Sequence, residues 1–293
     1  MDKRLLLLFA FLLLIVGCNE KNTSLAGKSD NGSGNNSDDI ITILAVTGEP
    51  GTGASQIGND SMWTASINLG AWRTIIPNST IQKEEVQLEW LVKENELDEA
   101  MELLEANQIV KLQVTPPDEN NTMQLERVLE TNVSDDQLDE ILNKQLEPVY
   151  FQDEQFGKFE LDKGIDIFQN NVQWVQKPCY LFFNWHEDDK VMRSSLRTAH
   201  LLFEKQEEWD LKIKTFASDK LLVLANEWLA DGDSDLNEIT KELFINRMTI
   251  DSISVYPDGD FEMTFLDGDL FWGHTISVTG NVNGVFEDAT ISG

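Results

Sequence analysis

The sequence predicts an α+β protein with two domains, the C-terminal one containing an antiparallel β-meander packed against helices. Apolar and polar residues alternate in several short runs in both halves of the chain, which is typical of half-buried strands. Other runs carry apolar residues at helical spacing. Near the C-terminus, turn sequences such as PDGD, DG and NVNG join four strand-like runs, and such short connections favour antiparallel pairing.

The N-terminus has the pattern of a bacterial lipoprotein signal. Lys3 and Arg4 form a short basic region, and residues 5–16 form an apolar run. This run is shorter than the roughly 20 residues that a membrane-spanning helix needs. It ends in IVGC, which resembles the lipobox of bacterial lipoproteins. The resemblance implies that residues 1–17 are a signal peptide and that Cys18 is lipidated. An ordinary signal peptide that contains a cysteine is the alternative.

Residues 18–39 are expected to be the lipidated cysteine and a flexible polar linker, because they are rich in Asn, Ser, Gly and Asp. Two acyl chains, such as palmitate, are enough for stable membrane anchoring. We therefore expect an exported protein of the cell envelope. The anchor would hold it at the outer face of the cell membrane, or at the outer membrane if the cell has one.

The composition is strongly acidic, with 52 Asp and Glu residues, 22 Lys and Arg residues and a formal net charge of −30. Such a surface repels nucleic-acid phosphates and anionic lipids. We therefore expect no nucleic-acid partner, and contact with the membrane only through the lipid anchor. The expected partner is an envelope protein or a small ligand. No cofactor is predicted, apart from the calcium considered below.

Residues 40–148 are predicted to form the N-terminal α+β domain. Period-2 alternation predicts its strands, and the clearest one carries Trp63, Ala65, Ile67 and Leu69 on one face. The strands are expected at Ile40–Val46, Trp63–Leu69, Val86–Trp90, Val110–Val114 and Met123–Val133.

Two helices are predicted in the same domain. Asn95 is the expected N-cap of the first, whose apolar residues are spaced as on one helical face. Ser134 and Gln137 resemble a capping box at the start of the second, which should end before Pro148. The apolar face of the first helix is expected at Leu97, Met101 and Leu104.

Residues 149–293 are predicted to form the C-terminal α+β domain. The strand-like runs FGKFELD, VQWV and CYLFFNW come first. Helical patterns follow at residues 188–208, 218–229 and 239–244. Cys179 lies in an apolar run and is expected to be a small buried hydrophobic residue. Four strands are expected to close the chain: Thr249–Tyr256, Phe261–Leu266, Leu270–Thr279 and Val285–Ser292.

The sequence DGDLFWGH near the C-terminus contains the first candidate site. In a structural interpretation, His274 lies on the apolar face of a strand and hydrogen-bonds to Asp267 or Asp269. In a functional interpretation, these three residues and Trp272 line a ligand pocket at the sheet edge. The candidate ligand-binding residues are therefore Asp267, Asp269, Trp272 and His274.

A second candidate is a calcium loop in DGDSDLNEITKE. Asp231, Asp233 and Asp235 occupy positions 1, 3 and 5 of the loop pattern, and Glu242 occupies position 12. The sharp turn at position 6 calls for glycine, whereas this chain has Leu236 there. The alternative is an acidic loop between two helices.

The C-terminal sequence also resembles a known family. The runs FGKFELD, YLFFNW, LANEW and ITKELF, followed by DGDLFWGH, look like the uncharacterised bacterial family named domain of unknown function 2262. The resemblance covers residues 150–293. It implies a domain boundary but no activity.

We expect a membrane-anchored lipoprotein that is a binding or interaction module, with the region around Trp272 as its contact surface. The alternative is an envelope hydrolase or a metal-dependent enzyme with a site near His274 or His186. No histidine in the chain has metal-binding spacing such as H-E-x-x-H, and no serine lies in a G-x-S-x-G motif. A binding role is therefore preferred over an enzymatic one.

Overall fold

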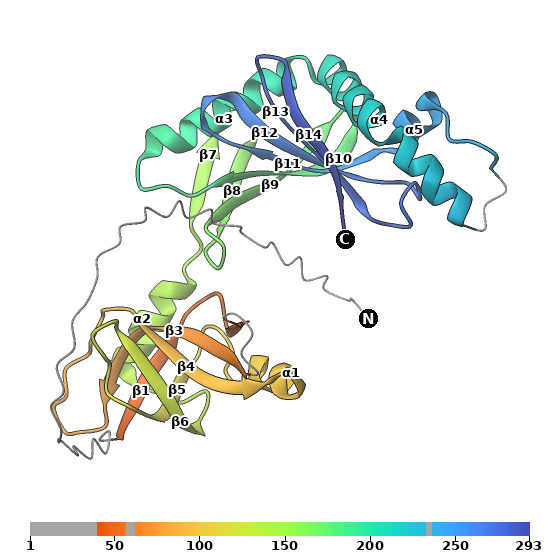
Figure 1. Ribbon diagram of the computed structural model, residues 1–293. Coiled ribbons are helices and arrows are strands. Elements are labelled where there is room, and N and C mark those ends of the chain that lie inside the picture. Colours follow the sequence, from red (N-terminus) through yellow and green to blue (C-terminus); the bar gives the residue numbers. More distant parts are fainter. Residues whose placement is uncertain (1–39, 57–61, 233–235) are drawn as a thin grey trace, which may run out of the picture. The chain divides into compact units, whose positions relative to one another are not determined.

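The computed structural model describes residues 40–56, 62–232 and 236–293, which contain two separate β-sheets with associated helices (Figure 1). The first sheet is built from residues 41–130 and the second from residues 150–292. The predicted α+β class with two domains is confirmed. In the described part of the chain, no helix is both long enough and apolar enough to cross a membrane.

The first sheet closes on itself to form a small barrel. Its strand order is β1-β5-β6-β4-β3-β2, and β1 also pairs with β3. All pairs are antiparallel except β4 with β6. This Greek-key order is the arrangement found in five-stranded OB-fold barrels. The strands are β1 (Ile41–Thr47), β2 (Gly53–Ser55), β3 (Met62–Thr74), β4 (Val86–Lys93), β5 (Ile109–Val114) and β6 (Thr122–Glu130).

Alternation along these strands places one row of side chains inside the barrel. On β3, Ala65, Ile67 and Leu69 are buried, as predicted. A short helix between β4 and β5 adds Ala100 to the same core, and the segment after it adds Leu104. Because apolar and polar residues alternate along these strands, closing the sheet buries the apolar side chains inside the barrel and leaves the polar side chains on its outer face. The helix comprises a 3₁₀ turn, η1 (Glu94–Glu96), and α1 (Leu97–Met101).

The predicted helix caps in this domain were wrong. Asn95 lies inside η1, and Glu96 precedes α1. Because the helix starts with a 3₁₀ turn and has a single α-turn, Met101 points outward and is 41% exposed. The second helix, α2 (Asp136–Leu146), is capped by Asp135, whose carboxylate accepts the N–H of Leu138 at 3.2 Å.

Asp135 also forms an ion pair with Arg73 of β3. This partner and the capping hydrogen bond hold the pKa of Asp135 below its ordinary value, although burial acts in the opposite direction. The charged form is therefore favoured, and it accepts hydrogen bonds better than the hydroxyl of Ser134 would. The helix ends at Leu146, just before Glu147 and Pro148, as the proline predicted.

The second sheet has eight strands in the order β14-β13-β12-β11-β10-β9-β8-β7. Neighbouring strands are antiparallel except β10 and β11, which are parallel. Two meanders are thus joined side by side, and the predicted C-terminal meander is confirmed. The strands are β7 (Tyr150–Asp153), β8 (Gly157–Asp162), β9 (Ile167–Trp174), β10 (Lys177–Asn184), β11 (Thr249–Val255), β12 (Asp260–Leu266), β13 (Thr275–Asn281) and β14 (Val285–Ser292).

Parallel strands need a long crossover, and here the crossover is helical. It contains α3 (Asp189–Glu204), α4 (Gln206–Asp231) and α5 (Lys241–Arg247). The helix predicted at residues 218–229 is the second half of α4, which starts directly after α3. The break expected after residue 208 lies instead at Lys205, where the backbone leaves the helical region.

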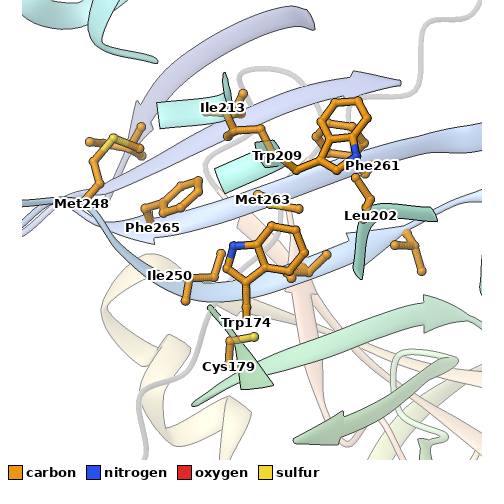
Figure 2. Packing of buried hydrophobic residues seen from close by; sticks show 14 of the residues in the cluster. Trp174, Cys179, Leu202, Trp209, Ile213, Met248, Ile250, Phe261, Met263 and Phe265 are labelled. Carbon is orange, nitrogen blue, oxygen red and sulfur yellow. The ribbon is translucent and has the colours of Figure 1, made fainter. Parts of the chain in front are cut away.

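One face of the second sheet packs against α3 and α4 to form the larger core (Figure 2). Trp174 and Phe261 are almost completely buried, and Trp209 of α4 packs edge-on against Phe261. Burying each such side chain stabilises the fold by about 1.5–3 kcal/mol. Cys179 is buried in this core, as predicted, and burial raises the pKa of its thiol to about 12.

Candidate functional site

The segment from Asp267 to His274 is a compact loop between β12 and β13. The strand expected from Leu270 was wrong, because β13 begins only at Thr275. Four residues of the loop have positive φ angles: Gly268 (58°), Asp269 (72°), Trp272 (58°) and Gly273 (91°). For a residue as bulky as tryptophan, this backbone conformation is unusual and costs of the order of 1 kcal/mol or more. Other contacts of the loop must therefore stabilise this backbone conformation of Trp272.

The carboxylate of Asp267 supplies that constraint. The residue is 3% exposed. Its Oδ2 accepts the backbone N–H of Phe271 at 2.6 Å and that of Gly273 at 3.2 Å, and its Oδ1 accepts the N–H of Asp269 at 3.2 Å. One side chain thus satisfies three backbone donors of an irregular segment, which would otherwise lose hydrogen bonds to water without replacement.

Apolar packing also holds the loop against the core of the domain. Leu270 and Phe271 are both buried and point into the core. Phe271 makes edge contacts with Trp228 of α4, at a centroid distance of 5.6 Å, and with Phe244 of α5, at 6.1 Å. A β-carbon on Gly268 would lie 2.5 Å from the carbonyl oxygen of Arg247, so only glycine fits there.

The same anchoring turns Trp272 outward, where it is 58% exposed. Its ring lies 4.8 Å from that of Trp228, at an angle of 50°. His274 meets Trp228 edge-on at 5.3 Å. These three residues, Trp228, Trp272 and His274, form an aromatic corner at the end of α4. Chemically, such a corner offers π-faces and an indole N–H for contact with a ligand or partner.

The structure changes the predicted role of His274. Its Nδ1 donates to the carbonyl oxygen of Phe271 at 2.6 Å. It therefore does not take Asp267 or Asp269 as its partner. Nor does it lie on the buried face of a strand, because it precedes β13 and is partly exposed. The structure thus brings Trp272 and His274 together at Trp228 and assigns Asp267 to the support of the loop.

The other predicted site residues lie elsewhere. Asp231 is the last residue of α4 and Glu242 lies in the first turn of α5, whereas Asp233 and Asp235 fall outside the described residues, as does Cys18. The structure therefore gives no test of the calcium loop or of lipidation.

The histidine of the second enzymatic candidate also has a local structural contact. His186 precedes α3, and its Nδ1 accepts the N–H of Asp188 at 2.9 Å. Within residues 40–56, 62–232 and 236–293, His, Cys, Asp and Glu form no group of three or more with the proximity expected of metal ligands.

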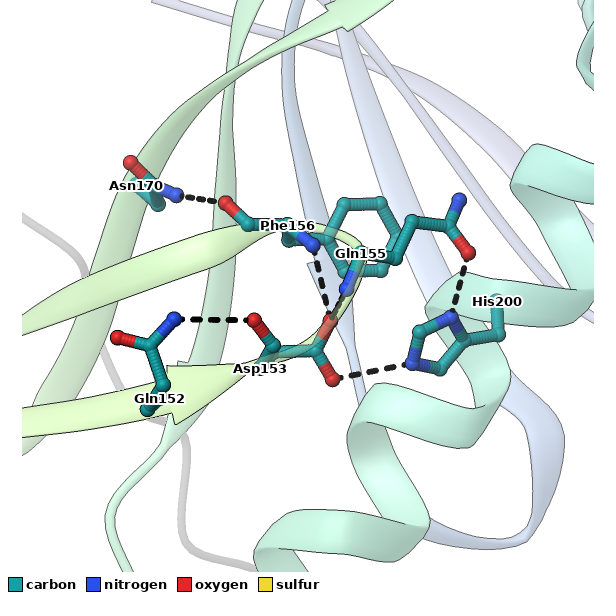
Figure 3. Close-up of polar contacts among 6 residues, drawn as sticks. All are labelled: Gln152, Asp153, Gln155, Phe156, Asn170 and His200. Atoms are coloured by element: carbon teal, nitrogen blue, oxygen red, sulfur yellow. Dashed lines mark hydrogen bonds and ion pairs between the residues drawn. The ribbon is translucent and has the colours of Figure 1, made fainter.

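A polar cluster that the sequence analysis missed links α3 to the β7–β8 hairpin (Figure 3). Nε2 of His200 lies 3.0 Å from Oδ2 of Asp153, and Nδ1 lies 2.8 Å from Oε1 of Gln155. The other oxygen of Asp153 accepts the N–H groups of Gln155 and Phe156, each at 2.9 Å. The ring of Phe156 lies 5.0 Å from the imidazole of His200.

These hydrogen bonds decide the charge of Asp153. Burial acts to raise the pKa of its carboxyl, but the N–H groups of Phe156 and Gln155, together with His200, outweigh burial and lower it. Asp153 is thus held as a carboxylate. No sequence spacing could have indicated the pair, because Asp153 and His200 are 47 residues apart and lie on different elements.

Replacing Asp267 with alanine should destabilise the protein by about 2 kcal/mol or more, because buried N–H groups lose their acceptor. The exposed neighbour provides the control: Asp269→Asn retains a residue that tolerates positive φ and should change stability by less than about 0.5 kcal/mol. Urea unfolding of both variants measures the difference. Equal stabilities would contradict the supporting role of Asp267.

The Asp153 carboxylate should make stability depend on pH. Its pKa is lower in the folded state than in the unfolded chain, where it is about 3.9. Its contribution is therefore present above about pH 4 and lost as the pH falls through the folded value. Asp153→Asn should cost about 1–2 kcal/mol near pH 7, and the cost should shrink towards about pH 3. A cost that stays constant in urea unfolding across this range would refute the assignment.

Comparisons with known families match both halves of the chain. Residues 34–145 match a family described as a domain of unknown function, DUF7021. Residues 153–291 match a family described as an uncharacterized protein conserved in bacteria, DUF2262. No curated protein matches the chain. The resemblance noted in the sequence is therefore confirmed over residues 153–291, which include the Trp272 loop and the Asp153–His200 cluster.

Proposed function

We propose that this protein is an exported, lipid-anchored binding module whose C-terminal domain contacts a protein partner through Trp272. The observation that carries the proposal is the exposure of this side chain on a fixed loop. Its backbone conformation is strained, the residue is 58% exposed, and the buried Asp267 carboxylate holds the segment in place. Strain of this kind is retained where the surrounding structure enforces it, and it clusters at functional sites.

A rigid exposed tryptophan suits a binding surface for energetic reasons. It offers a large contact area and loses little side-chain entropy on binding, and tryptophan is enriched among the residues that dominate binding energy. Trp228 extends the surface on one side. Because Leu270 and Phe271 already fix the loop, a partner would find the surface preformed.

Charge indicates the class of partner. The chain carries a formal net charge of −30. Around the aromatic corner, Glu227, Asp231 and Asp269 are exposed acids, and Arg247 is the nearby base, whose guanidinium bonds to the carbonyl oxygen of Asp269. A basic protein surface fits this setting, since an arginine or lysine can lie over an indole face while its charge meets the surrounding acids.

The membrane attachment in this proposal rests on the N-terminal sequence. The basic start, the apolar run and the IVGC lipobox support lipidation of Cys18, and the polar linker would let the folded part reach away from the bilayer. The acidity of the chain supports contact with the membrane through the anchor alone.

The enzymatic alternative has less support from the geometry. His274 uses Nδ1 to bind a backbone carbonyl, and His186 uses Nδ1 to accept a backbone N–H. Within the described part of the chain, neither ring is hydrogen-bonded to a carboxylate or a hydroxyl that would complete a nucleophile and base pair. Both contacts are those of residues that fix local structure.

Site-specific photo-cross-linking in cells tests the proposal. A photoreactive residue at position 272 should give one defined cross-linked product, to be identified by mass spectrometry. The same residue at Val223, which is 73% exposed on α4, is the matched control and should not give that product.

The identified partner, once purified, should bind the Trp272→Ala variant at least about tenfold more weakly than the native protein, because truncating an anchor tryptophan typically costs about 2 kcal/mol or more. Equal affinity of the two proteins, or a product that forms equally from position 223, would reject the Trp272 surface.

A further inference from the structure

One face of α3 presents a row of basic side chains. Arg193, Arg197 and His200 follow one another at successive helical turns, so their side chains lie on the same side of the helix. With Asp153 and Leu196 they line an open pocket of about 280 Å³. This pocket lies beside the β7–β8 hairpin. It shares no residue with the aromatic corner.

The first arginine is held in place by its neighbours. Nε of Arg193 donates to Asp189 at 2.6 Å, and its guanidinium carbon lies 5.2 Å from the ring centre of Phe151. The terminal nitrogens of Arg193 form no hydrogen bond with the described residues. The guanidinium of Arg193 is therefore oriented through its Nε, and its terminal nitrogens can donate to a ligand.

The second arginine carries the uncompensated charge. Arg197 is exposed at the pocket, and no ion pair or hydrogen bond joins its side chain to another residue in the described ranges. Asp153 is the one carboxylate among the residues that line the pocket, and it is already engaged by His200 and two backbone N–H groups, while Asp189 is engaged by Arg193. The pocket is thus left with excess positive charge in a chain of net charge −30.

We propose that this pocket binds a phosphate group through Arg193 and Arg197. Guanidinium groups donate in a planar fork that matches phosphate oxygens, and two of them one turn apart can reach different oxygens of one tetrahedral anion. A carboxylate has only two oxygens and would be satisfied by one arginine. His200 would act as a positioning residue, because both of its ring nitrogens already have partners.

Phosphate titration tests the site. Thermal unfolding of the soluble chain from Ile40 is followed in rising inorganic phosphate at constant ionic strength. The native protein should show a saturable rise in melting temperature, and Arg197→Gln and Arg193→Gln should each weaken the apparent affinity at least about tenfold. Arg127→Gln removes an exposed arginine of β6 and should behave like the native protein. This matched control separates binding from the general stabilising effect of phosphate on proteins.

Vesicles distinguish the source of the phosphate group. Phosphatidylcholine vesicles with and without phosphatidylglycerol are sedimented with the same soluble protein. Given the acidic surface, we expect no co-sedimentation, which together with phosphate binding assigns a small soluble phosphate as ligand. Co-sedimentation that Arg197→Gln abolishes would assign a lipid head group to the same site. Identical phosphate titrations of the native protein and both pocket variants, with no arginine-dependent vesicle binding, would overturn the proposal.

Discussion

The buried carboxylate of Asp267 is the interaction on which the proposed binding surface depends. A loop with four positive φ angles cannot form the backbone hydrogen bonds of a strand or helix, so its N–H groups need another acceptor. Asp267 accepts three of them, and Phe271 packs into the core between α4 and α5. Together these contacts leave Trp272 no inward position. Trp272 is therefore exposed because the hydrogen bonds to Asp267 fix the backbone on both sides of it and because its neighbour Phe271 occupies the core.

The topology of the sheet explains where this loop can lie. The two meanders meet at the parallel β10–β11 pair, and the helical crossover between those strands places α4 and α5 against the β12–β13 loop. Trp228 near the end of α4 therefore meets residues of the β12–β13 loop that are more than 40 positions later in the sequence. The same crossover brings α3 against the first hairpin, where His200 meets Asp153. The Asp153–His200 pair thus joins a hairpin to a helix of the crossover, whereas the hydrogen bonds of Asp267 stay within its own loop.

The sequence allowed prediction of most strands, because alternation of apolar and polar residues is a local signal that burial in a sheet requires, but the short strands β2 and β7 were missed. The closure of the barrel through the β1–β3 and β1–β5 pairs was not predictable, since it depends on pairing between distant segments. The loop was mistaken for a strand because Leu270 and Trp272 alternate. In the structure the adjacent residues Leu270 and Phe271 are both buried, which a strand with alternating faces does not allow. The loop conformation that buries both depends on the hydrogen bonds to Asp267, which the sequence pattern does not reveal. The Asp153–His200 pair left no pattern in the sequence.

Amide hydrogen exchange measured by NMR tests the role of Asp267 most directly. The N–H groups of Phe271 and Gly273 lie in an irregular loop, where exchange is normally fast, yet both donate to the carboxylate of Asp267. We predict that both amides are strongly protected in the native protein and lose that protection in Asp267→Ala. The amide of Glu119, in the exposed turn before β6, has no hydrogen-bond acceptor within the described residues and serves as the comparison in the same spectrum. Exchange of Phe271 and Gly273 in the native protein at the rate of an unstructured chain would show that the carboxylate does not hold the loop.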